Sequence, residues 1–275
     1  MKKLLLFALV LLSVVLGYSL KSGGTFFPQT PSNLTETGDH KKQILRIALV
    51  SDSANENDFL EKALGIAKGK GINFVIGLGD WTEVGTLEEL RGAKKVFDNS
   101  GLEYFVTAGD HDLWDSRNRG EDALLNFGDV FGNSSQSFDR ENVRFVILDD
   151  SDIYLGISSD DWAQMSETLS DESELKFVFA HKTPFHPSSA HILGADSQEV
   201  SAQAQNLIDL LEEKEVDGFF SGDLHFFAKF KSPSGSVRIT TIGAVASERN
   251  FQGPRFGILT IYDDYSWEVE DVEIR

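Results

Sequence analysis

The chain has 275 residues, of which 41% are hydrophobic, so it can bury a sizeable core in one large domain or two small ones. Its formal net charge of −19 argues against a nonspecific interaction with nucleic acid or an anionic membrane surface, because phosphate groups repel such a protein. The absence of cysteine excludes disulfides, zinc–thiolate sites, a thiol nucleophile and a lipid anchor on cysteine.

Residues 1–17 have the pattern of an export signal. Met1-Lys2-Lys3 is basic, and the apolar run from Leu4 to Gly17 has signal-peptide length but is short for a membrane span. Small residues are poorly placed for cleavage, so the segment is predicted to be either a cleaved signal peptide or an N-terminal membrane anchor. Both export the remaining chain, which we expect to be extracytoplasmic, either secreted or anchored through this segment alone.

Residues 18–42 are polar and rich in Gly, Pro, Ser and Thr, which predicts a flexible linker. After the linker, short apolar runs alternate with amphipathic stretches, and residues 43–275 are predicted to form one domain. In its first half we expect strands at 44–50, 72–77 and 102–108 and helices at 55–71 and 86–101, the second helix ending at Gly101. In its second half we expect strands at 143–149, 174–180, 217–221, 237–243 and 255–263 and a helix at 201–215. Apolar strands separated by helices are typical of an α/β domain whose sheet is covered on both faces.

Five of the predicted strands end at a potential metal ligand, and the loops beyond the carboxyl ends of such strands converge. A single Gly-Asp after a strand is usually a turn or a helix N-cap. Five occurrences in chain order favour a metal site, because four crowded carboxylates would repel one another without a cation. A glycine precedes three of the aspartates and permits unusual backbone angles or close approach. The candidate ligands are Asp52, Asp80, Asp110, His181, Asp223 and His225.

These blocks resemble the motifs of the calcineurin-like metallophosphoesterases, a superfamily that includes the purple acid phosphatases. The family pattern is Asp-x-His (or Asp-x-Gly), Gly-Asp, Gly-Asn-His-Asp/Glu, a strand-end His, and Gly-His-x-His. In this sequence the blocks read, in the same order, Asp52-Ser53-Ala54, Gly79-Asp80, Gly109-Asp110-His111-Asp112, His181 and Gly222-Asp223-Leu224-His225. The resemblance implies a four-layer α/β sandwich: two stacked mixed β-sheets flanked by helices, with two divalent metal ions near the strand ends.

Three positions depart from the family pattern: Ala54 replaces a histidine ligand, Asp110 replaces an asparagine, and Asp223 replaces a histidine. The resemblance implies that one ion is held by Asp80, Asp110, His181 and Asp223, and the other by Asp52, Asp80 and His225. Because Ala54 cannot bind a metal through its side chain, the second of these sets is one ligand short, and its ion is expected to be weakly held, water-rich or absent. The oxygen-rich sets favour Mn²⁺, iron, Mg²⁺ or Ca²⁺ over Zn²⁺.

The resemblance implies a phosphoesterase that hydrolyses small phosphorylated substrates through a metal-activated hydroxide, and the N-terminal segment implies that it is exported. His111 matches the family's catalytic histidine. Glu83 is expected either to fill the gap left by Ala54 or to orient His111, and a solvated loop glutamate is an equal alternative. His191 matches, with approximate spacing, a substrate-side histidine of some purple acid phosphatases. Lys182 is either a phosphate contact or, more commonly for lysine, a surface charge.

Two other functions remain open from the sequence. One is a degenerate family member that binds a metal or a phosphorylated ligand without turnover, which the loss of a ligand at Ala54 supports and the retention of His111 opposes. The other is a structural exported domain whose carboxylates bind Ca²⁺ for stability.

Overall fold

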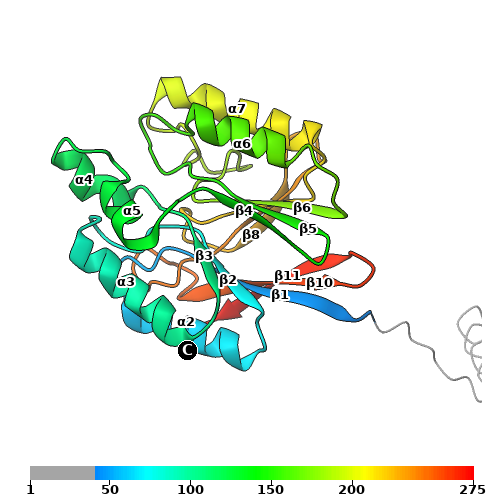
Figure 1. Ribbon diagram of the computed structural model, residues 1–275, viewed down its shortest axis with the longest axis horizontal. Helices are drawn as coiled ribbons and strands as arrows, with labels where there is room; N and C mark the ends of the chain where they lie inside the picture. The colour runs from blue at the N-terminus through cyan, green and yellow to red at the C-terminus, as the bar shows by residue number, and fades with distance from the viewer. Residues whose placement is uncertain (1–40) are drawn as a thin grey trace, which may run out of the picture. The chain divides into compact units, whose positions relative to one another are not determined.

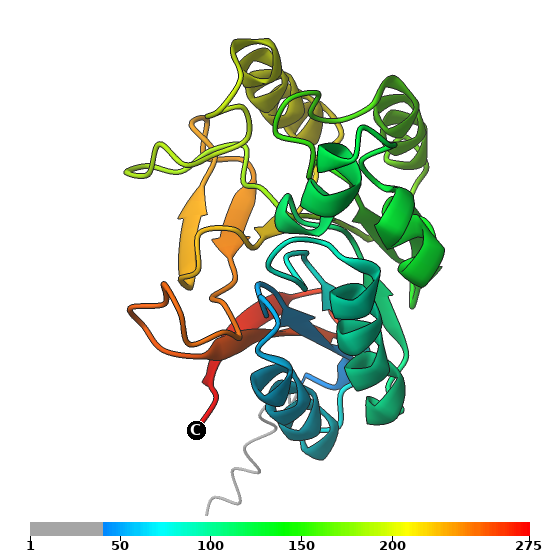
Figure 2. The ribbon, with the colours of Figure 1, turned by 90° about the vertical axis from the view of Figure 1, so that its left-hand side faces the viewer.

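The computed structural model describes residues 41–275; the predicted export signal and nearly all of the predicted linker lie outside the described residues. Two β-sheets stack face to face (Figures 1 and 2). The five-stranded sheet has the order β11 (Trp267–Glu273), β10 (Arg255–Tyr262), β1 (Gln43–Val50), β2 (Phe74–Gly77) and β3 (Tyr104–Val106). The six-stranded sheet has the order β4 (Gln136–Arg140), β5 (Val143–Ile147), β6 (Leu175–Ala180), β7 (Gly218–Ser221), β9 (Arg238–Thr241) and β8 (Ala228–Lys231).

Both sheets are mixed. Strands β1, β2 and β3 are parallel, and β10 and β11 complete their sheet in antiparallel pairs. In the other sheet β5, β6, β7 and β9 are parallel, and the edge strands β4 and β8 pair antiparallel with them. The predicted architecture of two stacked mixed sheets is therefore confirmed. The carboxyl ends of parallel strands lie at one edge of each sheet, and the loops after them carry the candidate ligands.

Helices cover the outer face of each sheet (Figure 1). The five-stranded sheet packs against α2 (Asn57–Gly69), α3 (Leu87–Ser100) and α5 (Leu125–Phe131), and the short segments η1 (His111–Leu113) and α4 (Trp114–Asn118) precede α5. The six-stranded sheet packs against α6 (Ser159–Thr168) and α7 (Gln198–Glu213). None of the helices in residues 41–275 has the length and apolar character needed to cross a bilayer.

The side-chain alternation of the strands explains the four layers. In β1, Ala48 and Val50 pack toward α2 and α3, whereas Ile47 and Leu49 pack toward the opposite sheet. The strands of the other sheet alternate in the same way, with Phe177 of β6 facing inward. The layer between the sheets is rich in fully buried phenylalanine, and each such side chain contributes about 1.5–3 kcal/mol by leaving water. Because these strands are buried on both faces, their sequences are continuous apolar runs.

Candidate metal centre

The ligand-bearing loops of both sheets meet at one edge of the sandwich. The loops after β1, β2 and β3 carry Asp52, Asp80 and Asp110, and the segments after β6 and β7 carry His181, Asp223 and His225. The Asp52 amide donates to the Gly79 carbonyl at 3.0 Å, which joins the first two loops. The Asp223 amide donates to Asp52 Oδ1 at 3.2 Å, which joins the two sheets.

Several candidate ligands have left-handed backbone conformations. The φ angles are 54° for Asp52, 57° for Asp80, 61° for Asp223 and 58° for His225. Non-glycine residues seldom adopt such angles, at a cost on the order of 1 kcal/mol each, and they persist where surrounding contacts enforce them. This concentration of strain in the strand-end loops is typical of a functional site.

The glycines that precede three of the aspartates have the predicted roles. Gly79 has a φ of 93°. A Cβ on Gly109 would lie 2.1 Å from an oxygen of Asp80, and a Cβ on Gly222 would lie 1.8 Å from Ser51 Oγ. Only glycine therefore allows these loops to approach one another so closely.

All six candidate ligands are brought together, and two groups of them could hold an ion. Ligand atoms of Asp52, Asp80 and His181 lie within 4.8 Å of one another; we call these residues the first ligand group. Ligand atoms of Asp110, His181 and Asp223 also lie within 4.8 Å of one another; we call these residues the second ligand group. His225 Nε2 lies 3.6 Å from Asp52 Oδ1, beside the first group. His181 is thus placed between both groups rather than in one alone.

The first group fits a divalent cation. Asp52 Oδ2 and His181 Nε2 are buried and have no hydrogen-bond partner among the described residues. His181 Nδ1 lies 2.7 Å from the Leu78 carbonyl, which can only accept, so Nδ1 is protonated and Nε2 is the nitrogen that faces the carboxylates and can bind a metal ion once it has released its proton. Leaving such buried atoms unpaired costs about 1–3 kcal/mol each, and a bound cation would remove that cost.

Protons compete with a cation for these residues. Burial raises the pKa of Asp80 well above its usual range. Burial alone would lower the pKa of His181, but the nearby carboxylates, Asp80 first, raise it well above its usual value. A divalent ion that binds here displaces protons, so affinity rises with pH.

Lys182 is the unexpected member of the site. It is only 3% exposed, and its Nζ lies 2.9 Å from Asp110 Oδ1 and 2.9 Å from Asp223 Oδ1. Burial lowers its pKa, but the two carboxylates outweigh burial and raise the pKa above the usual lysine value. The expectation of a surface charge is therefore wrong, and the second ligand group already contains a cation.

His111 is oriented by the backbone of Glu83. His111 Nδ1 lies 2.8 Å from the Glu83 carbonyl oxygen, and the ring stacks on Trp114 with centroids 4.0 Å apart. The His111 amide also donates to Asp80 Oδ1 at 3.0 Å, which links the histidine to the first ligand group. The Glu83 side chain is exposed and belongs to neither group, so its contact with His111 uses the carbonyl and not the carboxylate.

Two buried aspartates brace the loops. Asp112 accepts from the amides of Trp81 and Thr82 and from the Gly109 amide, which ties the second strand-end loop to the third. Asp150 is fully buried and accepts from the amides of His181 and Lys182 at 2.9 and 3.0 Å. Burial raises the pKa of Asp150 to about 7. Sequence reasoning missed Asp150, although the strand predicted at 143–149 ends at Asp149 and Asp150 follows it directly, which is the same signal as in the other ligand loops.

His191 also reaches the site. Its Nε2 lies 3.1 Å from Asp223 Oδ1, and its side chain is 56% exposed. The hydrogen bond to Asp223 raises the pKa of His191. This histidine therefore lies at the open side of the second ligand group.

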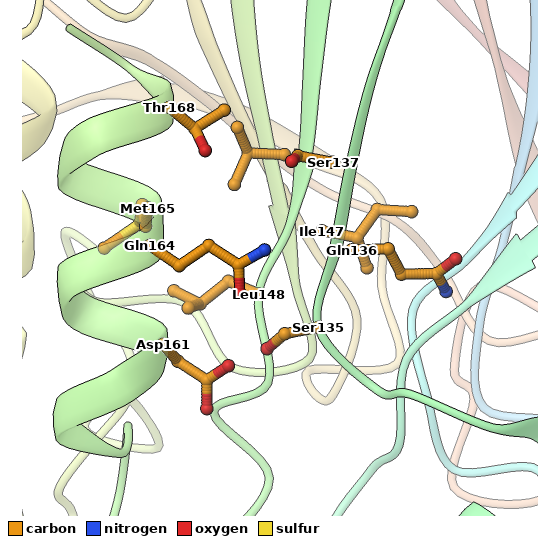
Figure 3. A pocket seen from close by; sticks show the side chains of 10 residues that line it. Ser135, Gln136, Ser137, Ile147, Leu148, Asp161, Gln164, Met165 and Thr168 are labelled. Atoms are coloured by element: carbon orange, nitrogen blue, oxygen red, sulfur yellow. The ribbon is translucent and has the colours of Figure 1, made fainter.

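The pocket in Figure 3 is a different feature. It lies between α6 and strands β4 and β5, and its lining includes Gln136, Gln164 and Met165 but no member of either ligand group. Its volume of about 10 Å³ is enough for about one water molecule and too small for a phosphorylated substrate.

Comparisons with known proteins agree with this geometry. The family model for calcineurin-like phosphoesterases matches residues 45–227. No curated protein matches the chain by sequence.

Solved structures show the same fold. A dimetal phosphatase from Danio rerio superimposes with a TM-score of 0.63 at 14% identity, covering 85% of this chain and 100% of that chain. A purple acid phosphatase from yellow lupin (Lupinus luteus) seeds gives 0.61 at 13% identity, covering 82% of this chain and 51% of that one. The anchor protein of the Plasmodium inner membrane complex gives 0.53 at 15% identity, covering 86% and 90%. At such identities the likeness shows a shared fold.

Proposed function

Since this chain belongs to the calcineurin-like phosphoesterase family, we propose that it is a metal-dependent hydrolase of phosphate esters, acting as a phosphatase or a phosphodiesterase on small phosphorylated substrates. One observation carries the proposal. Asp52, Asp80 and His181 gather with unpaired buried ligand atoms, and the His111 amide is hydrogen-bonded to the same Asp80.

We propose two divalent ions, one for each ligand group. Carboxylates dominate both groups, which favours Mn²⁺, iron, Mg²⁺ or Ca²⁺ over Zn²⁺. Such ions supply Lewis-acid polarisation of the phosphoryl group and activation of water. The second group is the weaker of the two, because Lys182 already pairs with its carboxylates. This reverses the expectation that the set containing Asp52 is the weaker one.

His111 is the residue proposed to move a proton. Because its Nδ1 donates to the Glu83 carbonyl, Nε2 is the nitrogen available to the substrate. In the protonated ring Nε2–H donates to a phosphoryl oxygen or to the leaving oxygen. General acid catalysis of this kind contributes about 10²–10⁴-fold to the rate.

The test is hydrolysis of p-nitrophenyl phosphate and bis(p-nitrophenyl) phosphate by the full-length chain, first stripped of metal and then supplied with Mn²⁺. We expect turnover only with metal, and a loss of about 100-fold or more in kcat for His111→Asn, which keeps a polar side chain but cannot carry the proton. The ratio of the two rates separates monoester from diester preference. Equal residual rates for wild type and His111→Asn would refute the proposal.

A second candidate function has a specific observation in its favour. The Lys182 ammonium contacts two carboxylates of the second ligand group, and Ala54 supplies no ligand beside the first. A protein that binds a metal or a phosphorylated ligand without turnover would tolerate both features. It would bind Mn²⁺ in the same assay and hydrolyse neither substrate with any divalent ion.

We also propose that the chain is exported. The support is the basic Met1-Lys2-Lys3 and the apolar run that follows it, which fit a signal peptide or an N-terminal anchor. Fractionation of cells expressing the full-length chain, with N-terminal sequencing of the product, tests this. Recovery of the intact chain from the cytoplasm would refute export.

A further inference from the structure

Lys182 lies between the two carboxylates of the second ligand group. Its Nζ is 2.9 Å from Asp110 Oδ1 and 2.9 Å from Asp223 Oδ1. His181 Nε2, the third member of the group, lies 3.4 and 3.7 Å from the same two oxygens. The ammonium therefore contacts one oxygen of each carboxylate in this group, while Asp223 Oδ2 is buried without a hydrogen-bond partner among residues 41–275.

The position of Lys182 is built into the fold. The residue directly follows His181 at the end of β6, and its amide donates to the buried Asp150. With 3% of its surface exposed, the side chain has little access to water, so its charge is compensated mainly by Asp110 and Asp223. These are also the two positions at which this chain has carboxylates in place of the asparagine and histidine of the family pattern. The two added negative charges are thus the ones that Lys182 neutralises.

The first ligand group has no such cation. Among residues 41–275, Asp52 and Asp80 form ion pairs only with the histidines of the site, and no lysine or arginine pairs with them. Asp52 Oδ2, which belongs to this group alone, is buried without a hydrogen-bond partner among the same residues. The two groups therefore offer different environments to an incoming ion: one is unneutralised, and the other is paired with an ammonium.

We propose that Lys182 competes with a metal ion for Asp110 and Asp223, so that the two ligand groups fill in sequence. The first group binds an ion at low metal concentration. The second group fills only when the metal concentration is high enough to displace the ammonium, because an ion pair shielded from water is costly to break. The inference rests on the proposed function only in taking the site to bind divalent ions. Lys182 thereby sets the metal concentration at which both ligand groups hold an ion.

The experiment is a metal titration without substrate. Full-length protein stripped of metal is titrated with Mn²⁺ by calorimetry, and bound Mn²⁺ is counted by elemental analysis after equilibrium dialysis. For wild type we expect one tight equivalent and a second that binds at least about tenfold more weakly. Lys182→Met removes the charge and keeps an unbranched side chain; it should leave the first step in place and tighten the second at least about tenfold. Lys176→Met is the control, because Lys176 lies on β6, before Lys182, and donates to the Lys214 carbonyl; it should match wild type.

If Lys182→Met fails to fold, the wild-type titration and Lys182→Arg decide the matter, since arginine keeps the competing charge and should preserve two separate steps. Two equal tight steps in wild type, or a second step that Lys182→Met leaves unchanged, would overturn the role of Lys182 and leave the proposed function standing. No binding of Mn²⁺ by wild type or any variant would overturn both.

Discussion

At the scale of single residues, the site depends on which atom of a side chain or backbone makes each contact. Glu83 and His111 illustrate this. The pair is joined by a hydrogen bond from His111 Nδ1 to the Glu83 carbonyl at 2.8 Å, while the exposed Glu83 carboxylate lies outside both ligand groups. A carbonyl fixes the histidine tautomer as well as a carboxylate does but adds no negative charge beside the ring. The identity of residue 83 should therefore matter less than its backbone position.

Glu83→Ala should therefore leave catalysis nearly unchanged. The variant keeps the carbonyl, so kcat for p-nitrophenyl phosphate hydrolysis with Mn²⁺ should stay within about threefold of wild type, against the loss of about 100-fold expected for His111→Asn. The full-length variants are compared at saturating substrate and metal. A loss in Glu83→Ala as large as that in His111→Asn would show that the carboxylate itself takes part in catalysis.

The residues that were predictable from the sequence are those whose signal is local. Asp52, Asp80 and Asp110 follow apolar strands directly, so their gathering followed from strand order alone. The role of Lys182 was not predictable, because it depends on the direction of a long side chain and on contacts with residues 41 and 72 positions away in the sequence. Asp150 has the same local signal, because it follows the apolar run of β5 and Asp149.

At the scale of elements, the apolar strands and the long helices were predictable, and three of the four edge strands were not. The strand predicted at 255–263 is β10 at Arg255–Tyr262, and the helix predicted at 86–101 is α3 with Gly101 as its left-handed C-cap. Strands β4, β8 and β11 were missed because each is half exposed, so polar and charged residues interrupt its apolar pattern. Helix α6 was missed because little of it is buried.

Helix α3 lies directly after the loop that carries Asp80 and Glu83, and its N-terminus is fixed by a capping box. Thr86 Oγ1 accepts from the Glu89 amide, and the Glu89 carboxylate accepts from the Thr86 amide at 3.0 Å. Thr86→Ala should lower the free energy of unfolding by about 1 kcal/mol, measured by urea denaturation. Ser197→Ala is the matched control, since Ser197 occupies the N-cap of α7 without a side-chain capping bond and should change stability by less than about 0.5 kcal/mol. Equal losses in both variants would assign the effect to helix propensity and not to the cap.

At the scale of the whole molecule, the two sheets pack together through a buried, phenylalanine-rich interior and also contact each other at the acidic edge. The interior between the sheets includes Phe74, Phe145 and Phe177. At the edge, the first ligand group takes Asp52 and Asp80 from one sheet and His181 from the other. A cation bound there would join the sheets at the point where carboxylate repulsion otherwise opposes their approach.

Metal binding should therefore stabilise the entire sandwich. Full-length protein in EDTA is compared with protein in Mn²⁺ by thermal denaturation. At 100 times the dissociation constant, one bound ion contributes about 2.7 kcal/mol, which for a domain of this size raises Tm by about 5–10 °C. Added KCl at matched ionic strength controls for general screening of the net charge of −19 and should give a smaller shift. Asp80→Asn, which weakens the first ligand group, should lose most of the Mn²⁺-dependent rise. If KCl alone reproduced the full rise, or if Asp80→Asn retained it, the stabilisation would come from diffuse charge screening and not from an ion held between the sheets.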